Sequence, residues 1–167
     1  ILNEFPGIAL TFHPLDFYFL PFVEEAEKEA YPEAWNTSEL LQEIYNIRSH
    51  FFVMLRYGEL IGYAGFWDLV DEAHVTRVTV LPPYRRQGFA RPLMKNLIKE
   101  VSASGLEAIR LEVRETNYRA ILLYLTLGFR PVRYRNGYYR RTGENALEMF
   151  KQLEPHEISV KKGMDEA

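Results

Sequence analysis

The sequence predicts an α/β (α+β) fold, in which about six or seven strands form one sheet flanked by about four helices. Three observations support this class. Residues 75–80 are a β-branched run, and the apolar residues of 93–101 that follow have helical spacing. Two apolar runs, 51–56 and 60–67, flank a short turn with a glycine, which is typical of a β-hairpin. Asn117 can cap a further helix between strand-like segments.

The N-terminal part of the chain predicts one strand and two helices before the hairpin. Residues 8–12 are strand-like and are followed by a proline, and residues 16–30 form a helical segment rich in aromatic and acidic residues. A break with a proline follows at 31–35. Residues 36–39 then offer capping groups for a second helix, which runs through Tyr45.

The C-terminal part predicts three more strands and one more helix. Residues 108–113 alternate between apolar and polar side chains, as a strand does, and the helix that Asn117 caps ends at Gly128. Residues 129–134 and 146–153 predict two closing strands around a loop rich in glycine and arginine.

Length and composition predict one domain and exclude several kinds of site. The chain has 167 residues, and we expect a single domain over 1–153 followed by a flexible polar tail over 154–167. The absence of cysteine excludes disulfides, thiolate metal sites and cysteine nucleophiles. A net charge of −3 argues against a broadly basic surface for nucleic acid.

Hydropathy argues against a membrane partner. No apolar run approaches the roughly 20 residues that span a bilayer. The apolar stretch 10–23 is interrupted by polar residues and prolines, so it does not predict a signal peptide. A chain without cysteine also suits a reducing compartment, and we expect a cytoplasmic protein.

The stretch 74–94 organises the chain, because it passes from a strand through a basic, glycine-containing turn into a helix. The N–H groups at such a helix start point outward, where the helix dipole favours anions. Gly88 and Ala90 are small enough for a phosphate to approach the backbone. Positive charge is added by Arg85, Arg86 and Arg91. An ordinary strand-to-helix turn with solvated arginines explains the same residues, and the turn alone does not separate the two interpretations.

Glu112 and Tyr124 form a second candidate site. A strand, a loop and a capped helix separate them, and a return of this length can bring a carboxylate and a phenol to the same end of a sheet. The alternative is that Glu112 lies on a solvated face and that Tyr124 packs in the core with its hydroxyl satisfied.

Both stretches resemble motifs of the GNAT superfamily of N-acetyltransferases. The pattern Arg85-x-x-Gly88-x-Ala90 is similar to its cofactor turn, and Asn117-x-x-Ala120-x-x-Leu123-Tyr124-x-x-x-Gly128-Phe129 resembles its second signature. Residues 78–149 most closely resemble the RimI-type branch, which acetylates the N-terminal alanine of a ribosomal protein. The resemblance implies the GNAT fold, with a single mixed, mostly antiparallel twisted sheet.

The resemblance also implies roles for named residues. It implies direct transfer of an acetyl group from acetyl-CoA to an amine, with Glu112 as general base through a water and Tyr124 as general acid. A backbone N–H near Val80 would stabilise the oxyanion. Coenzyme A would be bound by Val78, Thr79, Val80, Arg85, Arg86, Gln87, Gly88, Phe89, Ala90, Arg91, Asn117 and Tyr124. The acceptor would be bound by Trp35, Tyr138 and Tyr139. No metal is expected, since the four histidines are scattered along the sequence.

The acceptor is the less defined part of the prediction. We expect the N-terminus of a protein, possibly a ribosomal protein, because an α-amine with a pKa near 8 is neutral far more often at pH 7 than a lysine with a pKa near 10.4. A lysine side chain or a small amine remains an alternative, as does a non-catalytic domain that binds coenzyme A. Residues 31–35 are longer than in the family, and Asn145 replaces an acidic residue. We expect a monomer or weak dimer, with no nucleic-acid or membrane partner.

Overall fold

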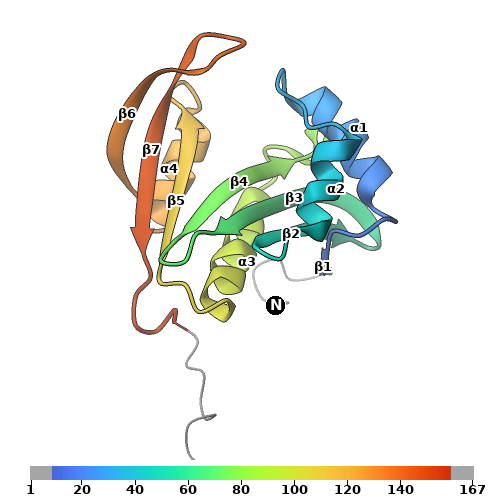
Figure 1. The fold of residues 1–167 in the computed structure, drawn as a ribbon, viewed down its shortest axis with the longest axis horizontal. Coiled ribbons are helices and arrows are strands. Elements are labelled where there is room, and N and C mark those ends of the chain that lie inside the picture. The colour runs from blue at the N-terminus through green and yellow to red at the C-terminus, as the bar shows by residue number, and fades with distance from the viewer. Residues whose placement is uncertain (1–8, 159–167) are drawn as a thin grey trace, which may run out of the picture.

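A computed structural model describes residues 9–158, which form one seven-stranded sheet with four α-helices (Figure 1). The strands are β1 (Leu10–Pro14), β2 (Ser49–Arg56), β3 (Glu59–Asp68), β4 (Ala73–Val80), β5 (Ala108–Arg114), β6 (Arg130–Tyr139) and β7 (Glu144–Gln152). The helices are α1 (Leu20–Ala30), α2 (Thr37–Tyr45), α3 (Ala90–Ala103) and α4 (Tyr118–Thr126). The strand order is β1-β2-β3-β4-β5-β7-β6, and only the β4–β5 pair is parallel. The predicted fold class is confirmed.

Local sequence explains where two of the helices begin. The Asn36 side chain accepts the backbone N–H of Glu39, and the Glu39 side chain accepts that of Asn36, so a capping box starts α2. The prediction that a helix begins at residue 16 was wrong by four residues. Asp16 Oδ1 accepts the N–H groups of Tyr18 and Phe19, at 3.0 and 3.2 Å, and this turn delays α1 until Leu20.

Two strands also differ from their predicted bounds. The strand expected at 129–134 continues to Tyr139, because pairing with β7 resumes at Tyr139↔Glu144 after an irregularity. The first strand was expected at 8–12 but is Leu10–Pro14, and Pro14 is tolerated because β1 lies at the edge of the sheet.

The sheet separates two hydrophobic cores, and each core is formed between one face of the sheet and the helices that cover it. Alternate residues of β2 point to opposite faces. Phe52 and Met54 belong to the core that contains the apolar residues of α3 and Tyr124 of α4. Phe51 and Val53 belong to a second core with the apolar residues of α1 and α2. The helices α1 and α2 therefore cover one face of the sheet, and α3 and α4 lie on the other face (Figure 1).

The sheet opens between β4 and β5. These strands pair only at Ala73↔Ile109 and His74↔Arg110, and beyond these residues they diverge, as the green and yellow arrows of Figure 1 show. A crossover through α3 places them side by side and parallel. The divergence leaves one edge of β4, beyond His74, without a neighbouring strand among the described residues.

The C-terminal stretch leaves the sheet at Leu153, whose backbone N–H donates to the Glu107 carbonyl. Glu157 then pairs with Lys151 at 3.1 Å. Of the tail expected at 154–167, residues 159–167 lie outside the described residues, as do residues 1–8. Within 9–158, none of the helices has both the length and the apolar character needed to cross a membrane.

Candidate active site

A cavity of about 520 Å³ lies where β4 and β5 diverge, and we call it the slot. It is lined by residues from both halves of the sheet, from α4, and from the segment between α1 and α2. Among them are Tyr31, Glu33, Trp35, His74, Arg77, Val78, Glu112, Arg114, Asn117, Tyr124, Tyr138 and Tyr139. The structure therefore brings together the two predicted catalytic residues, the three predicted acceptor-binding residues and Asn117.

One wall of the slot is the open edge of β4. A β-bulge near Thr76 shifts the register with β3, so that Arg77 pairs with Gly65 while Val75 pairs with Phe66. After the bulge, the Thr79 carbonyl faces β3, where a Cβ placed on Gly62 would lie 2.8 Å from it.

Because neighbouring residues of a strand point their backbone groups to opposite edges, the N–H and C=O groups of Val78 and Val80 face the gap. The Tyr31 hydroxyl donates to the Val78 carbonyl at 3.1 Å, and Arg85 Nε donates to the Val80 carbonyl at 2.9 Å.

The predicted anion-binding turn follows this edge. A short 3₁₀ helix (Pro82–Tyr84) leads into residues 85–88, which are exposed, and Gly88 has a φ of 84°. Phe89 is buried in the core and anchors the turn. In the part of the chain that the structure describes, α3 begins at Ala90 without a side-chain cap, because the N-cap residue is Phe89. The turn thus has the backbone geometry that was expected of an anion site.

Three other predicted residues in or beside the turn are held by neighbouring groups. Arg91 Nη2 donates to Thr126 Oγ1 at 2.9 Å, which ties α3 to the end of α4. Gln87 Nε2 donates to the Pro83 carbonyl at 3.0 Å. The hydroxyl of Thr79 meets that of Tyr31 at 2.5 Å, so its side chain points away from the turn.

Glu112 lies in β5 with a side chain that is only 6% exposed. Its Oε2 is 2.7 Å from His74 Nε2 on β4, and its Oε1 is 3.6 Å from Arg135 Nη1 on β6. The hydrogen bond with Glu112 raises the pKa of His74, and partial burial of the ring opposes that rise. Glu112 is therefore a buried carboxylate between two basic side chains, and not the solvated surface residue of the alternative interpretation.

Tyr124 reaches the slot from the opposite face of the sheet. It belongs to the same core as Leu111 and Val113, whereas Glu112 lies between these two residues in β5 and so points to the other face. The Tyr124 ring packs against Phe129, with centroids 5.7 Å apart. Burial raises the pKa of the Tyr124 hydroxyl, so this group keeps its proton at neutral pH.

Asn117 behaves as predicted at the start of α4. Its Oδ1 accepts the backbone N–H of Ala120 at 3.3 Å, and Gly128, with a φ of 93°, follows the end of the helix. This cap fixes the direction in which α4 leaves the sheet, and hence the position of Tyr124 in the slot.

A buried ion pair holds the segment between α1 and α2 against β4. Arg77 lies between the rings of Tyr31 and Trp35, at 4.3 and 4.4 Å from their centroids. Its guanidinium contacts Glu27, which is fully buried and also accepts the Tyr63 hydroxyl at 2.9 Å. Trp35 is therefore held in the wall of the slot by a network that also contains two core residues.

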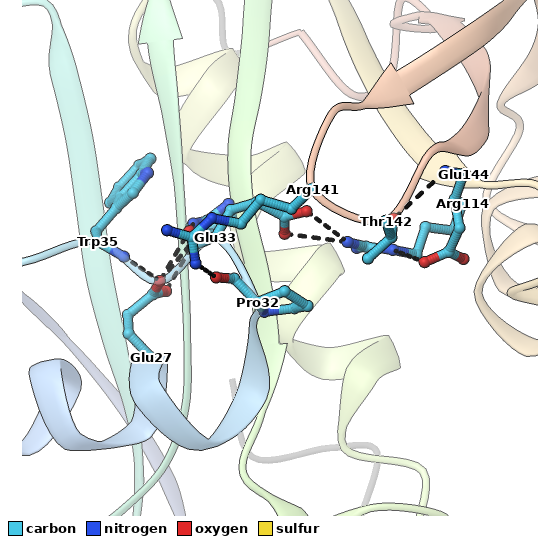
Figure 2. Close-up of polar contacts among 9 residues, drawn as sticks. Glu27, Pro32, Glu33, Trp35, Arg114, Arg141, Thr142 and Glu144 are labelled. Carbon is cyan, nitrogen blue, oxygen red and sulfur yellow. Dashed lines mark hydrogen bonds and ion pairs between the residues drawn. The ribbon is translucent and has the colours of Figure 1, made fainter.

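A second set of contacts joins the segment between α1 and α2 to Arg114 and to the turn between β6 and β7, and we call it the inter-loop bridge (Figure 2). Arg114 of β5 pairs with Glu33 at 3.0 Å and with Glu144 at 3.1 Å. Arg141, in the turn between β6 and β7, donates to the Pro32 carbonyl. Glu33 and Arg114 of the bridge also line the slot, so the bridge joins slot residues that are far apart in the sequence.

The aromatic pair Tyr138–Tyr139 lines the slot beside this bridge. Their rings are perpendicular, with centroids 5.0 Å apart. The guanidinium of Arg114 lies 3.9 Å from the Tyr139 ring, and that of Arg135 lies 4.7 Å from the Tyr138 ring.

Sequence reasoning missed His74 and Arg77, although both line the slot. One feature of the sequence could have indicated His74. It lies near the start of β4, and the crossover through α3 leads from β4 to β5, the strand that contains Glu112. The register His74↔Arg110 puts His74 and Glu112 on the same face, two residues apart, but the sequence does not reveal that register. Asn145, noted as a departure, donates to Glu115 at 2.9 Å and accepts the N–H of Gly137.

A domain with this divergent sheet, this turn and this pair of side chains has the architecture of an acetyltransferase, and comparison with known proteins agrees. Residues 20–129 match the model of the acetyltransferase (GNAT) family. The chain therefore belongs to the GNAT family and is an N-acetyltransferase.

Individual relatives confirm the resemblance to the RimI-type branch. The chain is 32% identical over 141 residues to the ribosomal protein bS18-alanine N-acetyltransferase of Escherichia coli K12, covering 83% of this chain and 95% of that protein. It is also 32% identical over 139 residues to an N-alpha-acetyltransferase of Sulfolobus acidocaldarius, covering 75% and 82% of the two chains. The crystal structure of the Escherichia coli ribosomal-protein-S18-alanine N-acetyltransferase matches with a TM-score of 0.79 at 29% identity, over 93% and 99% of the two chains.

Proposed function

We propose that this enzyme transfers the acetyl group of acetyl-CoA to the N-terminal α-amine of a protein in the cytoplasm, and that the acceptor is a ribosomal protein. The observation that carries the proposal is the placement of Glu112 and Tyr124. They enter one slot from opposite faces of the sheet, beside an open strand edge that leads to an anion-binding turn. The names of the relatives support the choice of acceptor.

The residues present fit coenzyme A. The backbone groups of Val78 and Val80 face the gap and offer an edge to which an extended pantetheine arm can add as a strand does. The uncapped start of α3, with Gly88 beside it, offers N–H groups to a diphosphate. Because Arg85 and Arg91 hold neighbouring groups, Arg86 is the arginine that we assign to the diphosphate, and Phe89 contributes its backbone alone.

The residues of the slot supply the chemistry that amine acetylation needs. Glu112 supplies the carboxylate of the general base, which takes a proton from the acceptor amine. The backbone N–H groups on the open edge of β4 stabilise the negative charge that develops on the thioester oxygen. Tyr124 gives its proton to the departing thiolate, which its raised pKa permits because the hydroxyl is protonated at neutral pH.

The acceptor peptide enters from the face that carries Glu112. On this face Trp35 and the Tyr138–Tyr139 pair line the slot, and the inter-loop bridge limits its width. An α-amine has a pKa near 8 and lysine one near 10.4, so an N-terminus requires about 3 kcal/mol less to deprotonate. A site with a single carboxylate base therefore suits an N-terminal amine better than a lysine.

An acetyl-transfer assay with peptides tests the proposal. The panel contains N-terminal peptides of ribosomal proteins, the same peptides with a blocked α-amine and a free lysine, and polyamines. We expect release of free thiol only with peptides that have a free α-amine, and fastest with one ribosomal sequence. Acetylation of the blocked peptides or polyamines would contradict the N-terminal acceptor, and binding of acetyl-CoA without any transfer would contradict the enzymatic role.

A further inference from the structure

His74 and Glu112 form a close pair at the point where β4 and β5 begin to diverge. His74 Nε2 lies 2.7 Å from Glu112 Oε2, and the His74 side chain, which lines the slot, is 28% exposed. A carboxylate can only accept at this contact, so Nε2 carries the hydrogen. That leaves Nδ1 as the nitrogen that can take a second proton.

We propose that the general base of this enzyme is the His74–Glu112 pair, and that the proton taken from the acceptor amine rests on Nδ1 of His74. This inference rests on the proposed function, because it assumes that the slot acetylates an amine. Glu112 then has two tasks: it orients the imidazole, and it stabilises the imidazolium that forms.

The reason lies in the acid strength of the two groups. An ordinary glutamate has a pKa near 4.3 and releases a proton at once at neutral pH, whereas histidine titrates near 6.5. Glu112 is further committed to Arg135, at 3.6 Å from its second oxygen. The group that can hold a proton in the slot near neutral pH is therefore the imidazole.

Other charged groups face the pair from the neighbouring strands. Arg110 of β5 is held by Glu72 and Glu148, at 2.9 and 3.0 Å, so its charge is compensated next to His74. Glu148 of β7 favours the imidazolium, whereas Arg110 opposes it. Tyr138 of β6 lines the same slot, and burial raises its pKa, so it stays neutral.

The protons of the reaction balance with this assignment. The acceptor ammonium carries three protons, and one of them passes to Nδ1 of His74, stays there until the amide has formed, and then leaves to water. The neutral amine then forms the C–N bond, and the C–S bond breaks. Tyr124 protonates the thiolate and regains the proton that the acylated nitrogen loses. The amide keeps the third proton.

The variant His74→Gln tests the proposal, because its amide can still donate to Glu112 but does not titrate. In the parent, a neutral His74 takes one proton from the bound ammonium, so log kcat/KM rises with a slope of one up to the pKa of the His74 imidazole and is level above it. In His74→Gln the amine must lose its proton before it binds, so we expect the rise to continue up to the pKa of the free α-amine, near 8, and kcat/KM at pH 7.5 to be at least tenfold lower. A rise that ends at the same pH in both enzymes would overturn the proposal.

Three measurements keep the outcome clear. His13→Gln removes an exposed histidine of β1 and should leave the profile unchanged. Calorimetry with acetyl-CoA shows whether His74→Gln is folded. If it is not, the ¹⁵N resonance of Nδ1 in the parent must titrate at the midpoint of the pH–rate profile, and a mismatch would also overturn the assignment. A parent enzyme that acetylates no amine contradicts the proposed function instead.

Discussion

At the scale of single residues, Tyr124 has a hydroxyl that can act only as a proton donor at neutral pH. Burial raises its pKa, and its ring is fixed against Phe129. Replacing Tyr124 with Phe removes the hydroxyl and keeps the packing. We expect kcat to fall by about 100-fold or more, the usual contribution of a general acid, while KM for acetyl-CoA stays within about twofold. Steady-state kinetics with a saturating acceptor peptide measure both values.

Tyr118 provides the matched control for this prediction. It lies on the same helix as Tyr124 but is 70% exposed. Tyr118→Phe should leave both kinetic constants unchanged. If Tyr124→Phe were as active as Tyr118→Phe, Tyr124 would be a packing residue and another group would protonate the thiolate.

At the scale of elements, the turn between β4 and α3 depends on a backbone conformation that side chains disfavour. Gly88 has a φ of 84°, and an alanine there costs roughly 1 kcal/mol. The strain falls on the N–H groups proposed to hold the diphosphate, so Gly88→Ala should raise KM for acetyl-CoA about fivefold. Gly58 has a φ of 82° in the β2–β3 turn, with open space around it. Gly58→Ala should lower stability equally and leave KM unchanged.

The inter-loop bridge predicts an effect on the acceptor alone. Arg114→Met keeps much of the side-chain length but loses the pairs with Glu33 and Glu144. We expect KM for the acceptor peptide to rise several-fold while KM for acetyl-CoA is unchanged, because the bridge lies on the Glu112 face of the slot. Arg130→Met, at an exposed position of β6, is the control. An equal rise in both KM values would show that Arg114 supports the whole sheet.

Local chemistry explains which elements could be predicted from the sequence. The caps at Asn36 and Asn117 and the run from β4 into α3 are short-range signals, and they were read correctly. The start of α1 was missed because the Asp16 side chain competes for backbone N–H groups. The full length of β6 was missed because it depends on pairing with β7, which is a long-range contact.

The residues of the candidate site could also be predicted only where a local motif identifies them. Glu112 and Tyr124 could be named because each belongs to a recognisable motif, and the structure places both in the slot. The partners of Glu112 could not be named, since His74 and Arg135 lie 38 and 23 residues away in sequence. Their meeting depends on strand register, and a shift of one residue would send them to the other face.

At the scale of the whole molecule, the sheet consists of two halves that share only two pairs of residues between β4 and β5. A ligand that fills the gap contacts both halves and adds hydrogen bonds to the open edge of β4. Binding to the folded state alone should stabilise the protein by about 2.7 kcal/mol at 100 times Kd. The free energy of unfolding in urea, with and without acetyl-CoA, measures this gain.

A more specific prediction concerns which backbone amides acetyl-CoA protects from hydrogen exchange. Amide hydrogen exchange should slow at Val78 and Val80, whose N–H groups face the gap, and in the turn at 86–90. The amides of β2 already pair with β1 and β3 and should change only with global stability. Desulfo-coenzyme A, which retains the diphosphate and most of the pantetheine arm, should protect the same amides. Protection that spread evenly over the sheet would mean that the ligand binds elsewhere and does not line the open edge of β4.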